Sequence, residues 1–179
     1  MEEKVFLDKL NNYKDDSDEL YSILIGFAKN NLNLYKYENI YEGFLADNSW
    51  ELRKAAIFGL LFKLGIKNVK YKNAAISFFI DTNEEFDLRV WALSSSSTAY
   101  EGTQDSQLLK EMYFLLNSKD ENLLLIESAF FALLGVWGVS AVEVEKKIKR
   151  NLDGEFLLND SIQMFKVEYS KIEKKVLIN

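Results

Sequence analysis

Apolar residues recur along this chain at the spacing of an amphipathic helix. In the segment 18–30 they fall at i, i+3, i+4 and i+7, as Leu20, Ile23, Leu24 and Phe27. The segment 50–64 repeats the pattern with Leu52, Ala55, Ala56, Gly59 and Leu60 on one face. Gly65 follows it and suits the left-handed residue that ends many helices. Both segments are therefore predicted to be helices.

The same periodicity predicts helices along the rest of the chain, with clusters of Asp, Asn, Ser and Gly between them as turns. The expected helices cover about 3–12, 18–30, 35–46, 50–64, 69–80, 86–100, 105–116, 122–137, 141–151 and 155–169 or beyond. Proline is absent and glycine numbers only 8, which favours helix over the turn-rich all-β classes. The predicted fold class is all-α.

One segment recurs three times at intervals of 36 to 37 residues. Its clearest copy runs from Asp47 to Leu60. The copies align as Asp47, Arg53, Ala56 and Leu60; Asp81, Arg89 and Ala92; and Asp120, Ala129 and Leu133. A period of this length is typical of stacked supersecondary units, which present a binding surface more often than a reaction centre.

The pattern Asp-x5-Arg-x2-Ala-x3-Leu resembles the signature of HEAT repeats. The second copy departs from it, with Asp81 eight residues before Arg89 and Ser96 at the leucine position. The third copy has Ile126 in place of the arginine, and the proline that is frequent in the family is missing throughout. The resemblance covers about residues 33–140.

It implies an α-solenoid of about 4–5 stacked antiparallel helix pairs, HEAT-like, forming one domain over 1–179. The clearest repeats would be 33–66, 67–102 and 103–140, with 1–32 and 141–179 as capping helices.

The resemblance also divides the repeat positions into two groups. In the family, a turn Asp and an Arg of the second helix form a ladder between neighbouring repeats. The expected structural ladder residues are therefore Asp47, Arg53, Asp81, Arg89 and Asp120. The second helices normally line the concave face, so positions that vary at the same phase are the candidate partner-binding residues. These are Lys54, Phe58, Val90, Ser94, Ser97, Glu127 and Phe131.

Two alternatives stay open at these positions. Phe58 and Phe131 are either exposed aromatics of a partner site or core side chains, since aromatics at helical spacing are often buried. The run Ser94 to Ser97 lies inside a predicted helix, where four small side chains either leave a shallow pocket or allow helices to pack closely.

Composition excludes several classes of chemistry. Histidine and cysteine are both absent, which removes disulfides, Ser–His and Cys–His catalysis, ordinary zinc sites and the metal-dependent HEAT-like lyases or hydroxylases that need histidine ligands. No Gly-rich phosphate loop and no isolated carboxylate pair in apolar surroundings is present. We therefore expect no cofactor, no metal and no enzymatic activity.

The chain carries a net charge of −6, which argues against binding to nucleic acid by phosphate neutralisation. The expected function is a protein–protein interaction module whose partner is another protein of basic character, as for an immunity or adaptor protein. The alternative is a DNA-binding or DNA-glycosylase-like HEAT solenoid, for which Asp87, Arg89 and Trp91 form a local polar and aromatic cluster.

The segment 123–142 carries one charge, Glu127, over nearly the length of a membrane span. Its alignment with the two earlier copies, and the cost of Glu127 in lipid, favour a central buried helix over a span. With no signal-peptide pattern at the N-terminus, a cytoplasmic location is expected.

Overall fold

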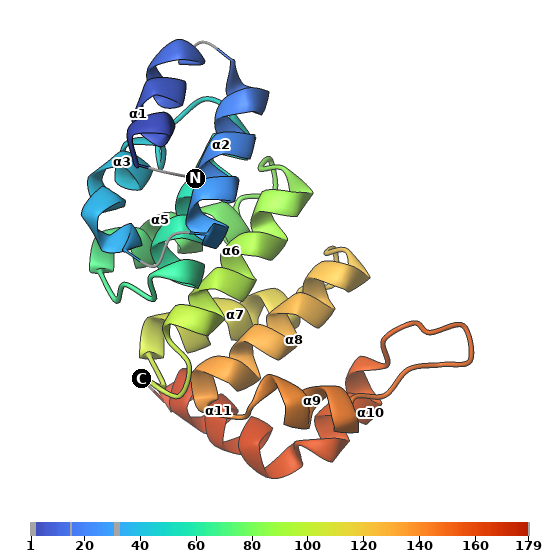
Figure 1. Ribbon diagram of the computed structural model, residues 1–179. Helices are drawn as coiled ribbons and strands as arrows, with labels where there is room; N and C mark the ends of the chain where they lie inside the picture. Colours follow the sequence, from blue (N-terminus) through green and yellow to red (C-terminus); the bar gives the residue numbers. More distant parts are fainter. Residues whose placement is uncertain (1–2, 15, 31–32, 179) are drawn as a thin grey trace. The chain divides into compact units, whose positions relative to one another are not determined.

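The computed structural model describes residues 3–14, 16–30 and 33–178. Residues 1–2, 15 and 31–32 of the predicted N-terminal cap, and residue 179, lie outside the described residues. Within the described ranges all elements are helical, apart from an isolated β-bridge between Arg150 and Phe156 (Figure 1). The prediction of an all-α class is confirmed.

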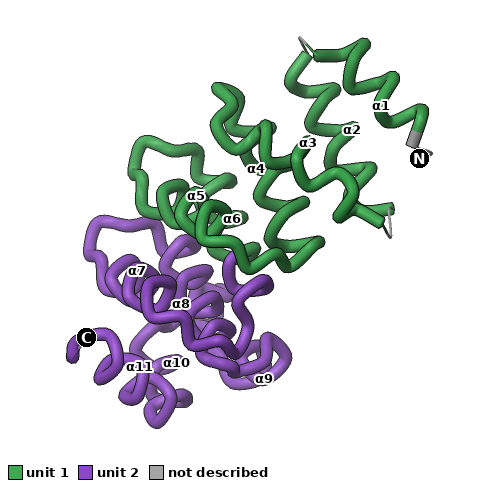
Figure 2. Tube along the Cα trace, turned by 90° about the vertical axis from the view of Figure 1, so that its left-hand side faces the viewer, with its two compact units in different colours: residues 1–95 green, residues 96–179 purple. Residues whose placement is uncertain are grey.

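The residues fall into two compact units, 1–95 and 96–179, shown in different colours in Figure 2. The boundary lies within one helix, α6 (Phe86–Ala99). Unit 1 contains α1 (Glu3–Asn12), α2 (Ser17–Asn30), the 3-10 helix η1 (Leu34–Tyr37), α3 (Glu38–Gly43), α4 (Trp50–Ile57), η2 (Phe58–Lys63), α5 (Val69–Ile80) and most of α6. Unit 2 contains α7 (Ser106–Leu116), α8 (Leu123–Trp137), α9 (Ala141–Lys147), α10 (Leu158–Met164) and α11 (Lys166–Ile178).

In unit 1, α2 packs against α1, α4 and η2, while α3 covers α4 and η2. The apolar stripe predicted for the segment 18–30 is buried as expected. Phe27 of this stripe stacks on Phe6 at 3.6 Å between ring centroids, and Tyr37 meets both rings edge-on. Burial of these rings fixes α1 to α2.

The predicted helix over 50–64 is continuous but changes its winding. α4 passes directly into η2, a π-helical segment, which is a rare conformation for more than one turn. Gly59 in η2 lies against the ring of Tyr41, where an added Cβ would come within 2.4 Å of Cδ1. The Tyr41 hydroxyl donates to the carbonyl of Leu24 at 2.8 Å, so the ring is held in place between α2 and η2.

In unit 2, α8 packs along α7, and α11 lies against both. The α8 helix ends at Trp137, where Gly138 adopts the left-handed conformation at φ +111°. In the described part of the chain, no helix is long and apolar enough to cross a membrane. The segment 123–142 thus comprises α8, a helix of 15 residues, then a turn and the first two residues of α9.

Three predicted boundaries are wrong. The helix expected over 35–46 is divided into η1 and α3, and ends at Gly43. The helix expected over 141–151 ends at Lys147, because residues 148–157 form a hairpin-like loop around Asp153 and Gly154. The helix expected from 155 begins only at Leu158 and is interrupted at Phe165, between α10 and α11.

Candidate partner-binding surface

The starts of α4 and α6 are tied together by Arg53. Ser49 caps α4 by accepting from the backbone N–H of Leu52. The Arg53 guanidinium donates to the carbonyls of Asp47 and Asn48 at 2.6 and 2.9 Å and pairs with Glu84 at 2.6 Å. Since Glu84 lies in the turn before α6, this network fixes the two helix starts relative to each other.

The ion pair of Arg53 corrects one detail of the predicted ladder. Its acidic partner is Glu84, whereas Asp47 caps the N–H of Ser49 and Asp81 accepts from Asn83. Arg89, 6% exposed, donates from Nε to the carbonyl of Phe79 at 3.2 Å, and Asp120 lies exposed before α8. Arg53 thus braces the turn before α4, whereas Arg89 bonds to the last turn of α5. An Asp–Arg pairing is wrong for Arg53.

Three aromatic rings surround the ammonium group of Lys54. Its Nζ lies 5.5 Å from the ring centroids of Tyr21 and Trp91 and 5.7 Å from that of Trp50. The same group pairs with the carboxylate of Asp87. We call these five residues the Lys54 cluster. They come from α2, α4 and α6, and all three rings are partly exposed.

In the Lys54 cluster, the charge of Lys54 is neutralised by Asp87, and the Asp87 side chain stays accessible to solvent. Burial acts to lower the pKa of Lys54, but the bonds to Asp87 and Tyr21 outweigh it and raise the pKa above its ordinary value. The Lys54 side chain is only 12% exposed, whereas that of Asp87 is 50% exposed. A molecule that approached the cluster would therefore meet aromatic faces and an accessible carboxylate.

Phe58 supports the cluster from inside. Its ring lies 5.5 Å from Trp91 and 5.3 Å from Phe62, and Phe62 lies 5.8 Å from Trp91. Phe58 is 4% exposed, so of the two alternatives left open for it the core one is confirmed. The π-helical segment η2 begins at this residue, and both of its phenylalanines contact Trp91.

The other predicted residues of α6 divide between surface and core. Val90 is partly exposed and Ser94 is exposed, both close to Trp91 along the helix. Ser95 and Ser96 are fully buried, and their hydroxyls have no hydrogen-bond partner in the described part of the chain. Ser97 donates to the carbonyl of Ala132 at 3.2 Å. The serine run thus favours close helix packing over a depression.

In unit 2, the predicted residues Glu127 and Phe131 lie one turn apart on α8. Glu127 is held by a two-pronged contact from Arg150. Phe131 is partly exposed and lines a shallow apolar pocket together with Ala141, Val142, Glu145 and Lys146.

The predicted partner-binding residues are divided between the two units. Unit 1 contains Lys54, Phe58, Val90 and Ser94, and unit 2 contains Ser97, Glu127 and Phe131. The shared concave face stays a prediction.

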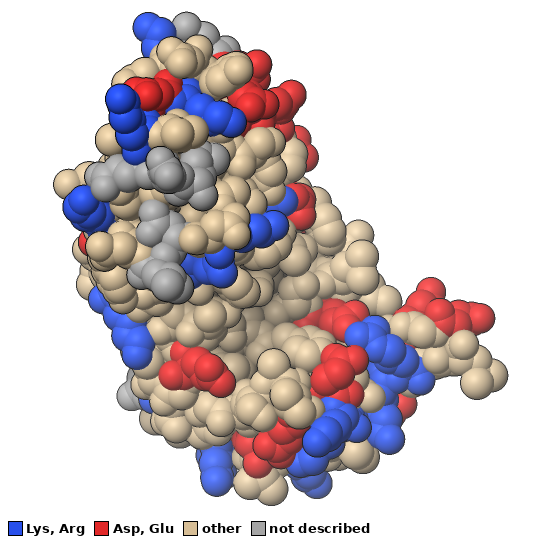
Figure 3. Space-filling view, in the orientation of Figure 1, with Lys and Arg blue, Asp and Glu red and all other residues tan. Residues whose placement is uncertain are grey.

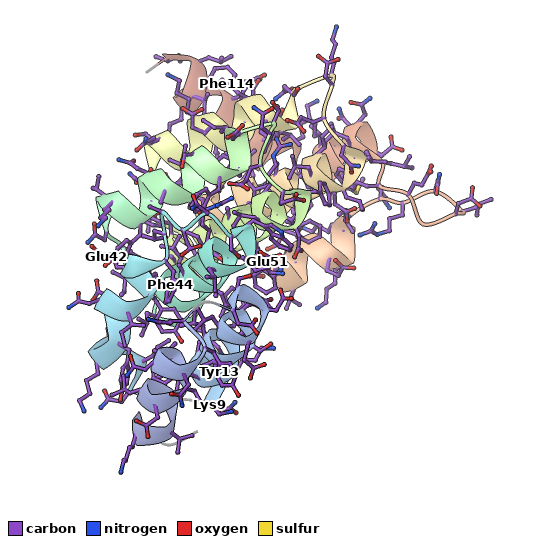
Figure 4. All side chains as sticks on the ribbon, turned by 90° about the horizontal axis from the view of Figure 1, so that it is seen from above. Lys9, Tyr13, Glu42, Phe44, Glu51 and Phe114 are labelled. Atoms are coloured by element: carbon purple, nitrogen blue, oxygen red, sulfur yellow. The ribbon has the colours of Figure 1, made fainter. Side chains whose placement is uncertain are left out.

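A second polar cluster joins α3 to α5. The Tyr71 hydroxyl lies 2.6 Å from carboxylate oxygens of both Glu38 and Glu42, and Lys70 pairs with Glu42 (labelled in Figure 4). Burial, and then the two carboxylates, raise the pKa of Tyr71, while the bonds from Lys70 and Tyr71 lower the pKa of Glu42. The phenol stays protonated at neutral pH and bridges two helices, which is a structural role.

No group of three or more acidic residues that could hold a metal ion exists among the described residues. Comparisons with protein-family models, with curated proteins and with solved structures find no match to this chain.

The spacing of residues along α4 and α6 is a sequence signal for the Lys54 cluster that the repeat pattern does not include. Trp50 and Lys54 are four residues apart on α4, and Asp87 and Trp91 are four residues apart on α6. Side chains at this spacing share a helix face. Two such pairs on neighbouring helices place two rings, a cation and an anion together. Tyr21 of α2 completes the site without any local signal.

Proposed function

We propose that this chain is a non-enzymatic interaction module, built as a HEAT-like stack of helix pairs, that binds a protein partner through the Lys54 cluster. The observation that carries the proposal is the convergence of Tyr21, Trp50 and Trp91, all partly exposed, on one charged pair. Tryptophan and tyrosine dominate the binding energy of protein interfaces, because one side chain buries a large area at a low cost in entropy.

The partner that fits this site best is basic. The chain carries 28 acidic against 22 basic residues, so its long-range field attracts positive surfaces. At the site itself, Asp87 retains half of its side chain exposed although it pairs with Lys54. An arginine of the partner would stack on Trp50 or Trp91 and share the Asp87 carboxylate. This supports an immunity or adaptor role towards a basic protein.

The test is affinity capture followed by a binding measurement. The tagged chain is used to capture proteins from its native source, and the affinity of the purified candidate is then measured for the wild type and for Trp50→Ala and Asp87→Asn. Each variant is expected to weaken binding by about 1–3 kcal/mol, or about 5- to 150-fold.

The matched control is Phe114→Ala, since Phe114 is an aromatic residue of α7 that is 49% exposed and lies outside the cluster. Circular dichroism checks that all variants stay folded. Equal affinity of wild type, Trp50→Ala and Asp87→Asn would remove the Lys54 cluster from the binding site.

The same cluster supports one alternative, a nucleic-acid site in a DNA-glycosylase-like HEAT solenoid. Two tryptophans and a tyrosine offer stacking platforms for bases, and Asp87 offers a carboxylate. The net charge and the engagement of Lys54 by Asp87 oppose it. Fluorescence anisotropy with single-stranded and duplex DNA at physiological salt separates the two functions, because the protein-binding proposal expects no saturable DNA binding.

A further inference from the structure

A hairpin-like loop in unit 2 carries a completely exposed leucine. Residues 148–157 project from α9 and α10 (Figure 1), and Leu152 near the tip has a relative exposure of 106%. This is the highest value among the exposed large apolar side chains of the described residues. An apolar side chain that is fully hydrated in the free protein is one whose burial by a partner gains the most.

The tip that presents Leu152 is held in one conformation by its own hydrogen bonds. Asn151 Oδ1 accepts from the N–H groups of Asp153 and Glu155 at 3.0 and 2.8 Å, and the N–H of Asn151 donates to the carbonyl of Glu155 at 2.9 Å. Gly154 takes the positive φ of +85° that the turn requires. Leu152 is therefore presented on a preformed turn, which lowers the entropic cost of docking it.

The base of the loop is fixed to the body of unit 2. Phe156 is buried and packs on Phe130 of α8 at 5.6 Å between ring centroids. Arg150 reaches Glu127 on the same helix and also donates to the carbonyl of Gly154. These contacts fix the base of the projecting loop to α8.

An apolar pocket lies in the same unit. It is lined by Phe131 of α8 and by Ala141, Val142, Glu145 and Lys146 of α9, and its volume is about 490 Å³. Val142 is 64% exposed, so nothing in the described chain covers it. Leu152 does not fill the pocket of its own chain, because its side chain is fully exposed.

From these features we infer that the chain self-associates, with Leu152 of each copy inserted into the Phe131–Val142 pocket of the other. When two copies are related by a two-fold axis, the leucine of each copy enters the pocket of the other and the contact is made twice. The volume of the pocket exceeds that of a leucine side chain. This interface uses unit 2 and is independent of the proposed function of the Lys54 cluster.

Charges around the two features suit this pairing. Asp153 and Glu155 flank the tip, and acidic side chains stand out on the projecting loop in Figure 3. Lys146, which is exposed and lines the pocket, would face them in the partner copy. Glu145, which lines the same pocket, opposes the approach, so the net attraction is small and is expected to depend on salt.

Sedimentation velocity over a concentration series tests the inference. The wild type is expected to form a dimer, and Leu152→Asn is expected to weaken dimerisation by about a hundredfold, because two buried leucines are lost per dimer. The control is Val167→Asn, an apolar residue of α11 that is 61% exposed and lies outside the loop and the pocket. A wild type that stays monomeric at every concentration, or a dimer that Leu152→Asn leaves unchanged, overturns the inference.

The absence of cysteine in the natural chain allows a direct test of the contact. Purified Leu152→Cys is mixed with Val142→Cys under mild oxidation, and a disulfide-linked heterodimer is expected to form faster than in a mixture of Leu152→Cys with Val167→Cys. All three positions are well exposed, so the variants should fold. Equal cross-linking in both mixtures would show that the leucine does not enter this pocket.

Discussion

Gly135 of α8 lies close to Ser97 of α6, and this contact gives a sharp test of the packing in unit 2. A Cβ added at Gly135 would lie 2.2 Å from Ser97 Oγ but 3.6 Å from Ser97 Cβ. The first distance is a severe overlap and the second is an ordinary contact. Replacing Gly135 by alanine should therefore clash with the hydroxyl alone.

The magnitudes follow from three terms. Alanine in place of glycine inside a helix gains about 1 kcal/mol. The displaced Ser97 hydroxyl loses its bond to the Ala132 carbonyl, which costs about 1 kcal/mol, and repacking around the extra methyl costs about 1–3 kcal/mol. Gly135→Ala is thus expected to lower the free energy of unfolding by about 1–3 kcal/mol. In a Ser97→Ala background the same change is expected to raise it by about 1 kcal/mol.

The assay is a double-mutant cycle measured by urea unfolding, followed by far-ultraviolet circular dichroism. The expected coupling energy is about 2–4 kcal/mol. Gly26→Ala, in α2, is the control for helix propensity, because an added Cβ there meets nothing within 4 Å. If Gly135→Ala destabilises the protein equally in both backgrounds, the hydroxyl is not what limits the approach of the helices and the reasoning fails.

Three further predictions concern unit 1. Gly59→Ala should lower the free energy of unfolding by about 1–3 kcal/mol, measured by urea unfolding, since the new methyl overlaps a buried tyrosine ring; a stabilised variant would contradict this. Glu84→Gln should cost about 1 kcal/mol by removing the charge that faces Arg53, whereas Asp81→Asn should cost much less; the opposite order would restore the predicted aspartate ladder. The native pKa of Tyr71 lies above its unfolded value of 10.0, so the stability that the protonated phenol contributes is complete below pH 10 and is lost as the pH rises further. In the wild type, the midpoint of thermal unfolding should therefore fall above pH 10, and Tyr71→Phe should make this fall shallower. An unchanged slope would refute the prediction.

Much of the helical pattern was predictable because its signals are local. The helix over 69–80 has the predicted bounds, and the ends of α7 at Leu116 and α8 at Trp137 agree as well. Caps such as Asn68, Asp105 and Asn122 bond to the N–H groups of their own first turns. Such signals depend on residues within one turn of one another and can be identified in the sequence.

The failures of prediction share the opposite property. The helical period of 141–151 continues past Lys147, but residues 148–157 form a loop whose returning segment is fixed by the packing of Phe156 on Phe130 of α8. The π-helical winding of η2 likewise involves the contact of Gly59 with Tyr41, which comes from another helix. Neither of these two tertiary contacts can be identified from the local sequence.

The sequence by itself determined the all-α class and most helix bounds, and it predicted Lys54 as a candidate binding residue, because its position in the repeat is one that the signature leaves free. Only the tertiary structure decided what Lys54 touches. Only the tertiary structure shows that Arg53 pairs with Glu84 and that Phe58 is buried in the core. It also places the ring of Tyr21 beside Lys54, together with the rings of Trp50 and Trp91. The physical reason is that periodicity specifies which face of a helix is apolar, whereas the identity of the neighbour across that face depends on how helices distant in sequence pack.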